Sequence, residues 1–191
     1  MKKGLLIILS GPSGVGKGTV RRLITDKHML SLEYSVSMTT RKPREGEVDG
    51  KDYFFVTEKE FKDHIANGNF LEYAEFVGNY YGTPKDKVEE LRNAGKNVFL
   101  EIEIKGASQV LQNVKDDRVI SFFLMPPSFE ALENRIRKRK SESEAIIQER
   151  LQKGKNEMTM TQNYDYIILN DKVGRAAKEI VDLVKKKDAE E

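Results

Sequence analysis

The sequence predicts an α/β protein in which helices pack on both faces of a mostly parallel sheet, and three observations lead to this fold class. Short apolar runs alternate along the chain with longer amphipathic stretches, as strands alternate with crossover helices in a parallel sheet. The first apolar run leads into a glycine-rich segment followed by a helical pattern. The length of 191 residues allows one core with an inserted flap or lid, but hardly two full domains.

The core elements can be placed from these patterns. Four apolar runs have the length of buried strands, and they cover Leu5–Leu9, Val98–Ile104, Val119–Met125 and Tyr166–Leu169. Helical patterns cover Thr19–Ile24, Gly106–Val114, Phe129–Lys140, Glu144–Gln162 and Gly174–Lys187. In an open parallel sheet, ligands bind at the carboxyl ends of the strands. We therefore expect the functional site at that edge.

The region from about Leu32 to Lys87 interrupts this alternation and predicts a small inserted subdomain above the crevice. Strand patterns cover Glu33–Met38, Tyr53–Val56 and Leu71–Val77. Thr57 and Glu60 have the spacing of a capping box, which predicts the start of a short helix. Thr83 is expected to cap a further helix, with Pro84 at its first position.

The segment Ser10–Thr19, SGPSGVGKGT, has the glycine and lysine spacing of a phosphate-binding loop. Its glycines allow backbone conformations and close approaches that a Cβ atom would prevent. Successive N–H groups at a helix N-terminus can then bind an anion, and Lys17 adds a positive charge. A glycine-rich turn that binds nothing is the alternative, but the strand before and the helix after this loop favour phosphate binding.

One position of the loop departs from the common pattern. Gly18 stands where the motif has the Ser or Thr that ligates Mg²⁺, and the hydroxyl comes one residue later at Thr19. One helical step rotates a side chain by about 100°, so we expect Thr19 to contact a phosphate oxygen instead. Phosphates and water would then hold most of the Mg²⁺ coordination shell.

Composition excludes several classes of protein. The formal charge of +2 gives no argument for binding nucleic acid or an anionic membrane. No apolar run approaches the ~20 residues that span a bilayer. The absence of cysteine excludes a disulfide framework and thiolate metal sites. The apolar run after Lys2 and Lys3 is shorter than the roughly seven to fifteen residues of a signal-peptide core. A cytoplasmic protein is the expectation.

Several motifs occur in a fixed order over nearly the whole chain. They are SGPSGVGKGT, SVSMTTRKPREGEVDGKDYFF, FLEYAEFVGNYYGTP, FLEIEIKG, LMPPS and YDYIILND. In this order they resemble guanylate kinase. The resemblance implies a P-loop NTPase three-layer sandwich with an inserted mixed-β GMP-binding subdomain and a helical lid. It also implies transfer of the γ-phosphoryl group of ATP, with Mg²⁺, to GMP. The oligomeric state stays open.

The resemblance implies boundaries within a single domain of residues 1–191. The core would comprise residues 1–32, 88–125 and 160–191. The GMP-binding subdomain would cover about 33–87, and the lid about 126–159.

Site residues follow from the same resemblance, position by position. The ATP-binding residues would be Gly11, Pro12, Ser13, Gly14, Val15, Gly16, Lys17, Gly18, Thr19 and Asn170. The GMP-binding residues would be Ser37, Arg41, Arg44, Tyr53, Glu72, Tyr81, Thr83 and Glu103. The catalytic residues would be Lys17, Arg41, Arg44, Arg135, Arg139 and Arg150, with Glu101 near the water shell of the metal. The family often has Asp at positions 101 and 103, and Arg-Gly-Thr where this chain has Arg139-Lys140-Ser141.

The residue chemistry agrees with a guanine base. Guanine presents its N1–H and N2–H₂ donors side by side, and the carboxylate of Glu72 can accept from both. A hydroxyl of Ser37 or Thr83 can donate to O6, where adenine carries an amino group. A site built on such hydrogen bonds can reject the wrong base by as much as ~10⁴-fold.

Two other functions stay open at this point. The first is a nucleoside-monophosphate kinase of another base specificity, since Gly-Lys-Gly-Thr also occurs in adenylate kinases. The second is a non-catalytic guanylate-kinase-like module that binds proteins. Such modules typically have a degraded phosphate loop, whereas this loop retains its glycines and Lys17.

Overall fold

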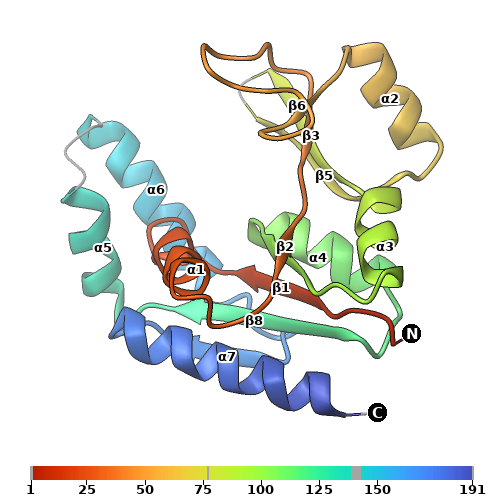
Figure 1. Ribbon diagram of the computed structural model, residues 1–191. Coiled ribbons are helices and arrows are strands. Elements are labelled where there is room, and N and C mark those ends of the chain that lie inside the picture. Colours follow the sequence, from red (N-terminus) through yellow and green to blue (C-terminus); the bar gives the residue numbers. More distant parts are fainter. Residues whose placement is uncertain (1, 77, 139–142, 191) are drawn as a thin grey trace.

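The computed structural model describes residues 2–76, 78–138 and 143–190. This part of the chain is built around a five-stranded parallel sheet with the strand order β2-β7-β1-β8-β9 (Figure 1). Its strands are β1 (Leu6–Ser10), β2 (Glu33–Tyr34), β7 (Val98–Glu101), β8 (Val119–Met125) and β9 (Tyr166–Leu169). Because the strands are parallel, their carboxyl ends meet at one edge, where the glycine-rich loop follows β1.

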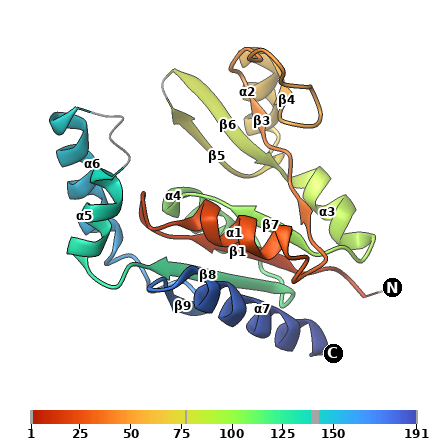
Figure 2. The same ribbon diagram turned by 60° about the vertical axis from the view of Figure 1, so that its left-hand side comes forward.

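Helices cover both faces of this sheet, as the sequence predicts (Figure 2). Side chains alternate between the faces of a strand, and every residue of β1 is buried. Ile7 and Leu9 pack with residues of α1 (Lys17–Asp26) and α7 (Val173–Ala189). Leu6 and Ile8 pack with residues of α3 (Lys85–Asn93) and α4 (Ile104–Asn113). The continuous apolar run of β1 therefore supplies the cores of both layers.

A second sheet, of mixed direction, stands above the first (Figure 1). Its strand order is β4-β3-β6-β5, with β3 (Met38–Thr39), β4 (Phe54–Phe55), β5 (Phe70–Phe76) and β6 (Asn79–Pro84). Helix α2 (Glu58–Ala66) begins with the predicted capping box of Thr57 and Glu60. Phe61 of this helix stacks on Phe70, with ring centroids 4.5 Å apart. The inserted region thus has a small apolar core of its own.

Three local predictions in and near this region are wrong. The expected strand Glu33–Met38 is two strands, because β2 pairs with β7 in the first sheet and β3 pairs in the second. Thr83 is not a helix cap: it lies in β6 opposite Glu72, and Pro84 is the N-cap of α3. Pairing with β5 outweighs the local cap signal. Strand β7 stops at Glu101, because Glu103 is already the N-cap of α4.

Helices α5 (Phe129–Arg137) and α6 (Glu144–Glu157) rise on the opposite side from the second sheet (Figure 1). Ser128 caps α5, because its hydroxyl accepts a hydrogen bond from the N–H of Ala131. Both helices end earlier than their sequence patterns predict. The predicted continuation of α5 to Lys140 extends into residues 139–142, which lie outside the described residues. Among the described helices, none is long and apolar enough to cross a membrane.

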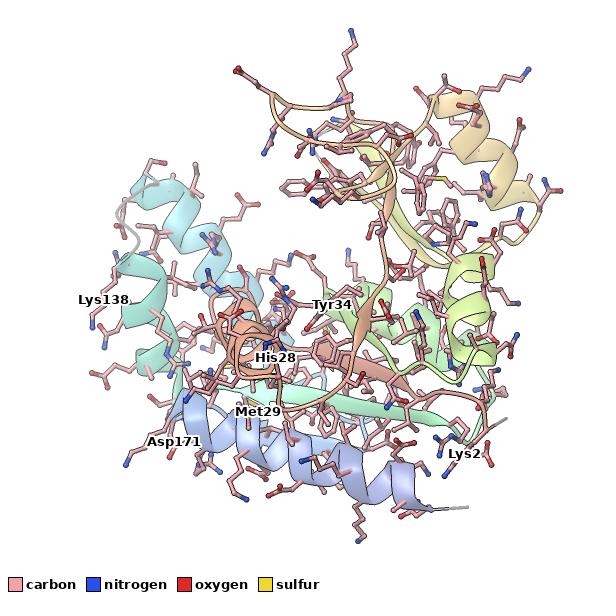
Figure 3. The ribbon with its side chains drawn as sticks, in the orientation of Figure 1. Lys2, His28, Met29, Tyr34, Lys138 and Asp171 are labelled. Atoms are coloured by element: carbon pink, nitrogen blue, oxygen red, sulfur yellow. The ribbon has the colours of Figure 1, made fainter. Side chains whose placement is uncertain are left out.

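A buried arginine connects several elements at the end of the sheet opposite the glycine-rich loop. The side chain of Arg92 is 0% exposed, and it forms ion pairs with Glu89 at 2.7 Å and Asp116 at 2.9 Å. Lys3 also contacts both carboxylates. At the same end, Lys2, labelled in Figure 3, donates to the carbonyl oxygen of Asp188. Removing one partner from such a network leaves a buried charge uncompensated, which is strongly destabilising.

Asp116 should make the stability of the fold depend on pH in acid. Burial raises the pKa of Asp116, but hydrogen bonds from Lys3 and the Arg118 N–H, with the charge of Arg92, outweigh it and lower the pKa to about 2. A carboxylate with a lowered pKa stabilises the fold fully above its unfolded value near 3.8, and this contribution is lost as pH falls towards about 2.

We expect Asp116→Asn to lower the free energy of unfolding at pH 7 by about 2 to 3 kcal/mol and to flatten its fall between pH 4 and 2. Urea unfolding at several pH values measures both effects. Asp117→Asn is the matched control, since Asp117 is exposed. Equal effects of the two substitutions would contradict this role of Asp116.

Candidate active site

The glycine-rich loop has the backbone geometry of an anion-binding nest. Gly11, Gly14 and Gly16 have φ angles of 144°, 85° and 104°, values that residues with a Cβ rarely adopt. Gly11 also has no room for a side chain, because a Cβ there would lie 2.4 Å from the carbonyl oxygen of Leu124. Gly16 is the N-cap of α1, so the loop presents N–H groups at a helix N-terminus.

Lys17 lies across this loop. Its Nζ donates to the carbonyl oxygens of Gly11 at 2.6 Å and Pro12 at 3.2 Å. Burial lowers the pKa of Lys17, while the charges of nearby carboxylates, with Glu101 first, oppose that shift. The ammonium group is thus held inside the nest, where it can neutralise a phosphate.

Two side chains support the loop from behind, and both bind the carbonyl oxygen of Val15. Asn170, directly after β9, donates from Nδ2 at 2.8 Å. Arg135 of α5 donates to the same oxygen at 2.9 Å and to the carbonyl oxygen of Asn170 at 2.6 Å. The resemblance implies a lid role for Arg135, but here its guanidinium group braces the loop backbone. The Oδ1 atom of Asn170 is buried without a hydrogen-bond partner among the described residues.

Helix α6 reaches the loop at Ser13. Arg150 donates to the Ser13 hydroxyl at 2.9 Å, and Glu157 accepts from the Ser13 N–H at 3.3 Å. Lys153 of the same helix forms ion pairs with Glu103 and Glu157. The sequence predicts Arg150 as a site residue but not Lys153 or Glu157. The sequence of a helix does not show which distant residues its charged side chains will contact.

The predicted site residue Arg139 lies outside the described residues.

A pocket of about 340 Å³ opens at the loop, and we call it the donor pocket. It is lined by Ser13, Gly14, Gly16, Lys17, Gly18, Thr19, Arg22, Glu101, Ile102 and Glu103. Most of these are predicted site residues, and Thr19 lines the pocket beside Gly18. Arg22 was missed by the sequence reasoning. Glu103 is expected at the GMP site, but it lines the donor pocket and pairs with Lys153 at 3.3 Å.

A second pocket of about 450 Å³ lies beside it, and we call it the acceptor pocket. It is lined by Arg21, Tyr34, Ser35, Val36, Ser37, Lys51, Asp52, Thr83, Phe99, Leu100, Glu101 and Ile102. Ser37 and Thr83 are thus brought to one cavity, although they belong to different segments of the inserted region. Glu101 and Ile102 line both pockets and form a shared wall.

Glu72 is next to the acceptor pocket through its partner Thr83. The Thr83 hydroxyl donates to Oε1 of Glu72 at 2.6 Å. Burial raises the pKa of Glu72, the hydrogen bond from Thr83 lowers it, and the charge of Glu103 raises it, with a net increase. The close approach of α4 depends on Gly106, where a Cβ would lie 2.8 Å from Oε2 of Glu72.

The arginine pair of the inserted region already binds a carboxylate. Arg41 forms a bidentate pair with Glu47, at 3.0 and 2.9 Å, and the N–H of Arg44 donates to the same carboxylate at 2.7 Å. The guanidinium carbon of Arg41 lies 5.3 Å from the ring centroid of Tyr53, and Tyr53 packs edge-on against Tyr81. Four predicted phosphate-binding residues are thus brought together, around an anion that the protein itself provides.

The site is compatible with Mg²⁺. Glu101 offers carboxylate oxygens, which suit this ion, and it lies at the donor pocket beside Gly18. No group of three or more His, Cys, Asp or Glu side chains gathers as a cation site within the described ranges. A Mg²⁺ ion bound here would need further ligands, which phosphate oxygens and water can supply.

A parallel sheet with a phosphate-binding loop after its first strand, and with two pockets at its carboxyl edge, defines a nucleotide-binding protein of the P-loop class. The sequence model of the guanylate kinase family matches residues 3–187. The chain belongs to the guanylate kinase family.

Individual relatives agree with this membership. A guanylate kinase of Mesoplasma florum is 55% identical over 183 residues, which are 95% of this chain and 61% of that protein. One of Lactobacillus delbrueckii is 50% identical over 182 residues, with 95% and 88% covered. The crystal structure of guanylate kinase from Anaplasma phagocytophilum superposes with a TM-score of 0.73 at 32% identity, covering 99% of this chain and 88% of that one. The chain thus spans less than two thirds of the Mesoplasma relative's length.

The phosphate-binding loop should need glycine at position 11 for two reasons: there is no room for a side chain, and the backbone has a positive φ angle. We expect Gly11→Ala to weaken ADP binding at least tenfold (about 1.4 kcal/mol) and to lower the melting temperature, because the methyl group would displace Leu124 and the loop. Calorimetric titration and thermal unfolding measure the two effects.

Gly68→Ala is the control for backbone strain alone. Gly68 has a φ of 67°, with nothing within 4 Å of a Cβ. If this control weakens ADP binding as much as Gly11→Ala does, steric exclusion at the loop is not the cause.

Proposed function

We propose that this protein is a guanylate kinase enzyme that transfers the γ-phosphoryl group of ATP to GMP, giving ADP and GDP. The observation that carries the proposal is the shared wall between the donor pocket and the acceptor pocket. One pocket contains a phosphate-binding loop, and the other contains two hydroxyls, one of which donates to the half-buried carboxylate of Glu72. Two nucleotides bound there would meet with their phosphates towards each other, which is the arrangement that phosphoryl transfer requires.

Glu72 and Thr83 would select guanine. Both N–H groups on the Watson–Crick edge of guanine can donate to the Glu72 carboxylate, and Ser37 can donate to O6. Adenine would place the lone pair of N1 against the carboxylate. The Thr83 hydroxyl holds Oε1 at 2.6 Å, which fixes the orientation of the carboxylate before the base arrives.

Arg41, Arg44, Tyr53 and Tyr81 would bind the GMP phosphate. They lie on the second sheet and its long β3–β4 connection, which Figure 1 draws at the far end of this sheet from α1. Transfer in this proposal needs the inserted region, about residues 33–87, and the lid, about 126–159, to close on the core. Closure would exclude water, which would otherwise accept the phosphoryl group.

The donor half of the reaction would depend on charge neutralisation. The N–H groups of the loop and the Lys17 ammonium would bind the ATP phosphates, and Arg150 with Arg139 would add positive charge. Mg²⁺, when bound, neutralises phosphate charge, and Glu101 would hold it through water. Because the transition state of phosphoryl transfer is loose, positioning and neutralisation matter more than a strong base. A cytoplasmic location is part of the same proposal.

A panel of acceptors tests the function directly. We expect rapid ADP formation in a coupled assay with GMP and ATP, and rates at least 10²-fold lower with AMP, CMP or UMP. A higher rate with AMP or UMP would show another base specificity. Absence of turnover with all acceptors, together with tight binding of a phosphopeptide by Arg41 and Arg44, would show a binding module instead.

The raised pKa of Glu72 should appear in the pH profile. GMP recognition needs the ionised carboxylate, so kcat/KM for GMP should fall as pH drops through a value above the 4.5 of an ordinary glutamate. Glu72→Gln should lower kcat/KM for GMP by about 10²-fold or more and remove this limb of the profile.

Glu75→Gln, on the exposed end of the same strand, is the control and should keep the acid limb. If Glu72→Gln retains both the activity and the acid limb, Glu72 does not read the base.

A further inference from the structure

Gly18 and Glu101 occupy neighbouring positions at the donor pocket, and the Glu101 carboxylate lies next to the place that a side chain on Gly18 would take. A Cβ on Gly18 would lie 3.4 Å from Oε1 and 4.0 Å from Oε2 of Glu101. That distance is ordinary contact for a methyl group, but a serine hydroxyl extends one atom further. The carboxylate of Glu101 therefore lies against the place where the common motif has a metal-binding hydroxyl.

Arg21 holds the carboxylate in this place. Its Nε donates to Oε2 of Glu101 at 2.6 Å. Arg21 follows Gly18 by three residues on α1, so both lie on one face of the helix. A charge-assisted hydrogen bond of this length restricts the direction of the carboxylate and leaves Oε1 as the oxygen nearer to Gly18.

The sheet supports Arg21 in turn. Its guanidinium carbon lies 5.5 Å from the ring centroid of Tyr34, the β2 residue labelled in Figure 3 beside α1. Thr25, one helical turn after Arg21, hydrogen bonds the Tyr34 hydroxyl at 2.6 Å and the Arg21 carbonyl oxygen at 2.9 Å. Glu101 is thus oriented by a chain of contacts from β2 through α1.

The position of Glu101 suits a contact with the metal shell. It lines both pockets, and it is the carboxylate whose charge acts most strongly on the Lys17 ammonium inside the loop. A carboxylate oxygen is a ligand type that Mg²⁺ and its bound waters accept, and its partners commonly determine how tightly such a site binds.

We propose that Arg21 is a positioning residue that directs the carboxylate of Glu101 into the space left by Gly18, so that Glu101 replaces the missing hydroxyl as the protein's contact with the water shell of nucleotide-bound Mg²⁺. This inference rests on the proposed function for its metal-nucleotide ligand. It explains the glycine in the motif and the long side chain at position 101 as a matched pair.

Calorimetric titration with ADP, in Mg²⁺ and in EDTA, tests the pair without any acceptor or turnover. The quantity measured is the Mg²⁺ gain, which is the ratio of the two dissociation constants. Gly18→Ser puts a hydroxyl against the carboxylate, and Glu101→Asp withdraws the carboxylate by about 1.5 Å. Each should lower the Mg²⁺ gain about threefold to tenfold. The double variant restores the common arrangement and should return the gain to within about twofold of the original protein.

Arg21→Gln should lower the Mg²⁺ gain about threefold to tenfold and change ADP binding in EDTA less than twofold. Arg21→Lys should restore part of the gain, because it keeps the charge. Lys178→Gln is the matched control: Lys178 pairs with Asp182 on α7, and its loss should leave the gain unchanged.

Two outcomes overturn the proposal. One is a double variant whose loss equals the product of the two single losses, since independent residues behave in this way. The other is an unchanged Mg²⁺ gain in both Arg21 variants. Because ADP binding needs no acceptor, these outcomes are distinct from failure of the proposed function, which the acceptor panel decides.

Discussion

The carbonyl oxygen of Val15 accepts the two hydrogen bonds on which the geometry of the site depends. One donor is Asn170, at the carboxyl end of β9, and the other is Arg135, from α5. The phosphate-binding loop is therefore fixed by two elements far from it in sequence. A nest of N–H groups binds an anion well only when its backbone does not have to reorganise, and these contacts remove that freedom.

The second half of the site is arranged differently. Tyr81 lies in a sheet with its own small core, and Arg41 and Tyr53 lie on the connection between its strands β3 and β4. This sheet is connected to the first sheet at β2 and at α3. Arg92, completely buried, fixes α3 to the N-terminal segment and to the loop before β8. The phosphate-binding loop is thus continuous with the main core through Val15, while the inserted sheet has a separate apolar core.

The sequence correctly predicts those elements that depend on residues close together in the chain. The family and the fold class are confirmed, strands β8 and β9 have their predicted bounds, and the capping box of α2 is present. Strand β6 was missed because its proline resembles a helix start and its pairing with β3 is non-local, although its pairing with β5 is a local hairpin. Arg21, Lys153 and Glu157 were missed for the same reason: each is an ordinary helical charge until the fold brings a partner to it. The roles of the predicted site residues stay predictions.

The pair formed by Arg41 and Glu47 has a consequence for how this surface behaves towards ions in solution. The guanidinium fork of Arg41 is already engaged by Glu47, so an anion from solution must displace this carboxylate to take both of its hydrogen bonds. A dianion, whether sulfate or a phosphate monoester, carries more charge than a carboxylate and competes for the fork better than a monoanion such as chloride does. Anions that bind Arg41 are therefore selected by their competition with the Glu47 carboxylate. A positive patch without such a carboxylate would not select among anions in this way.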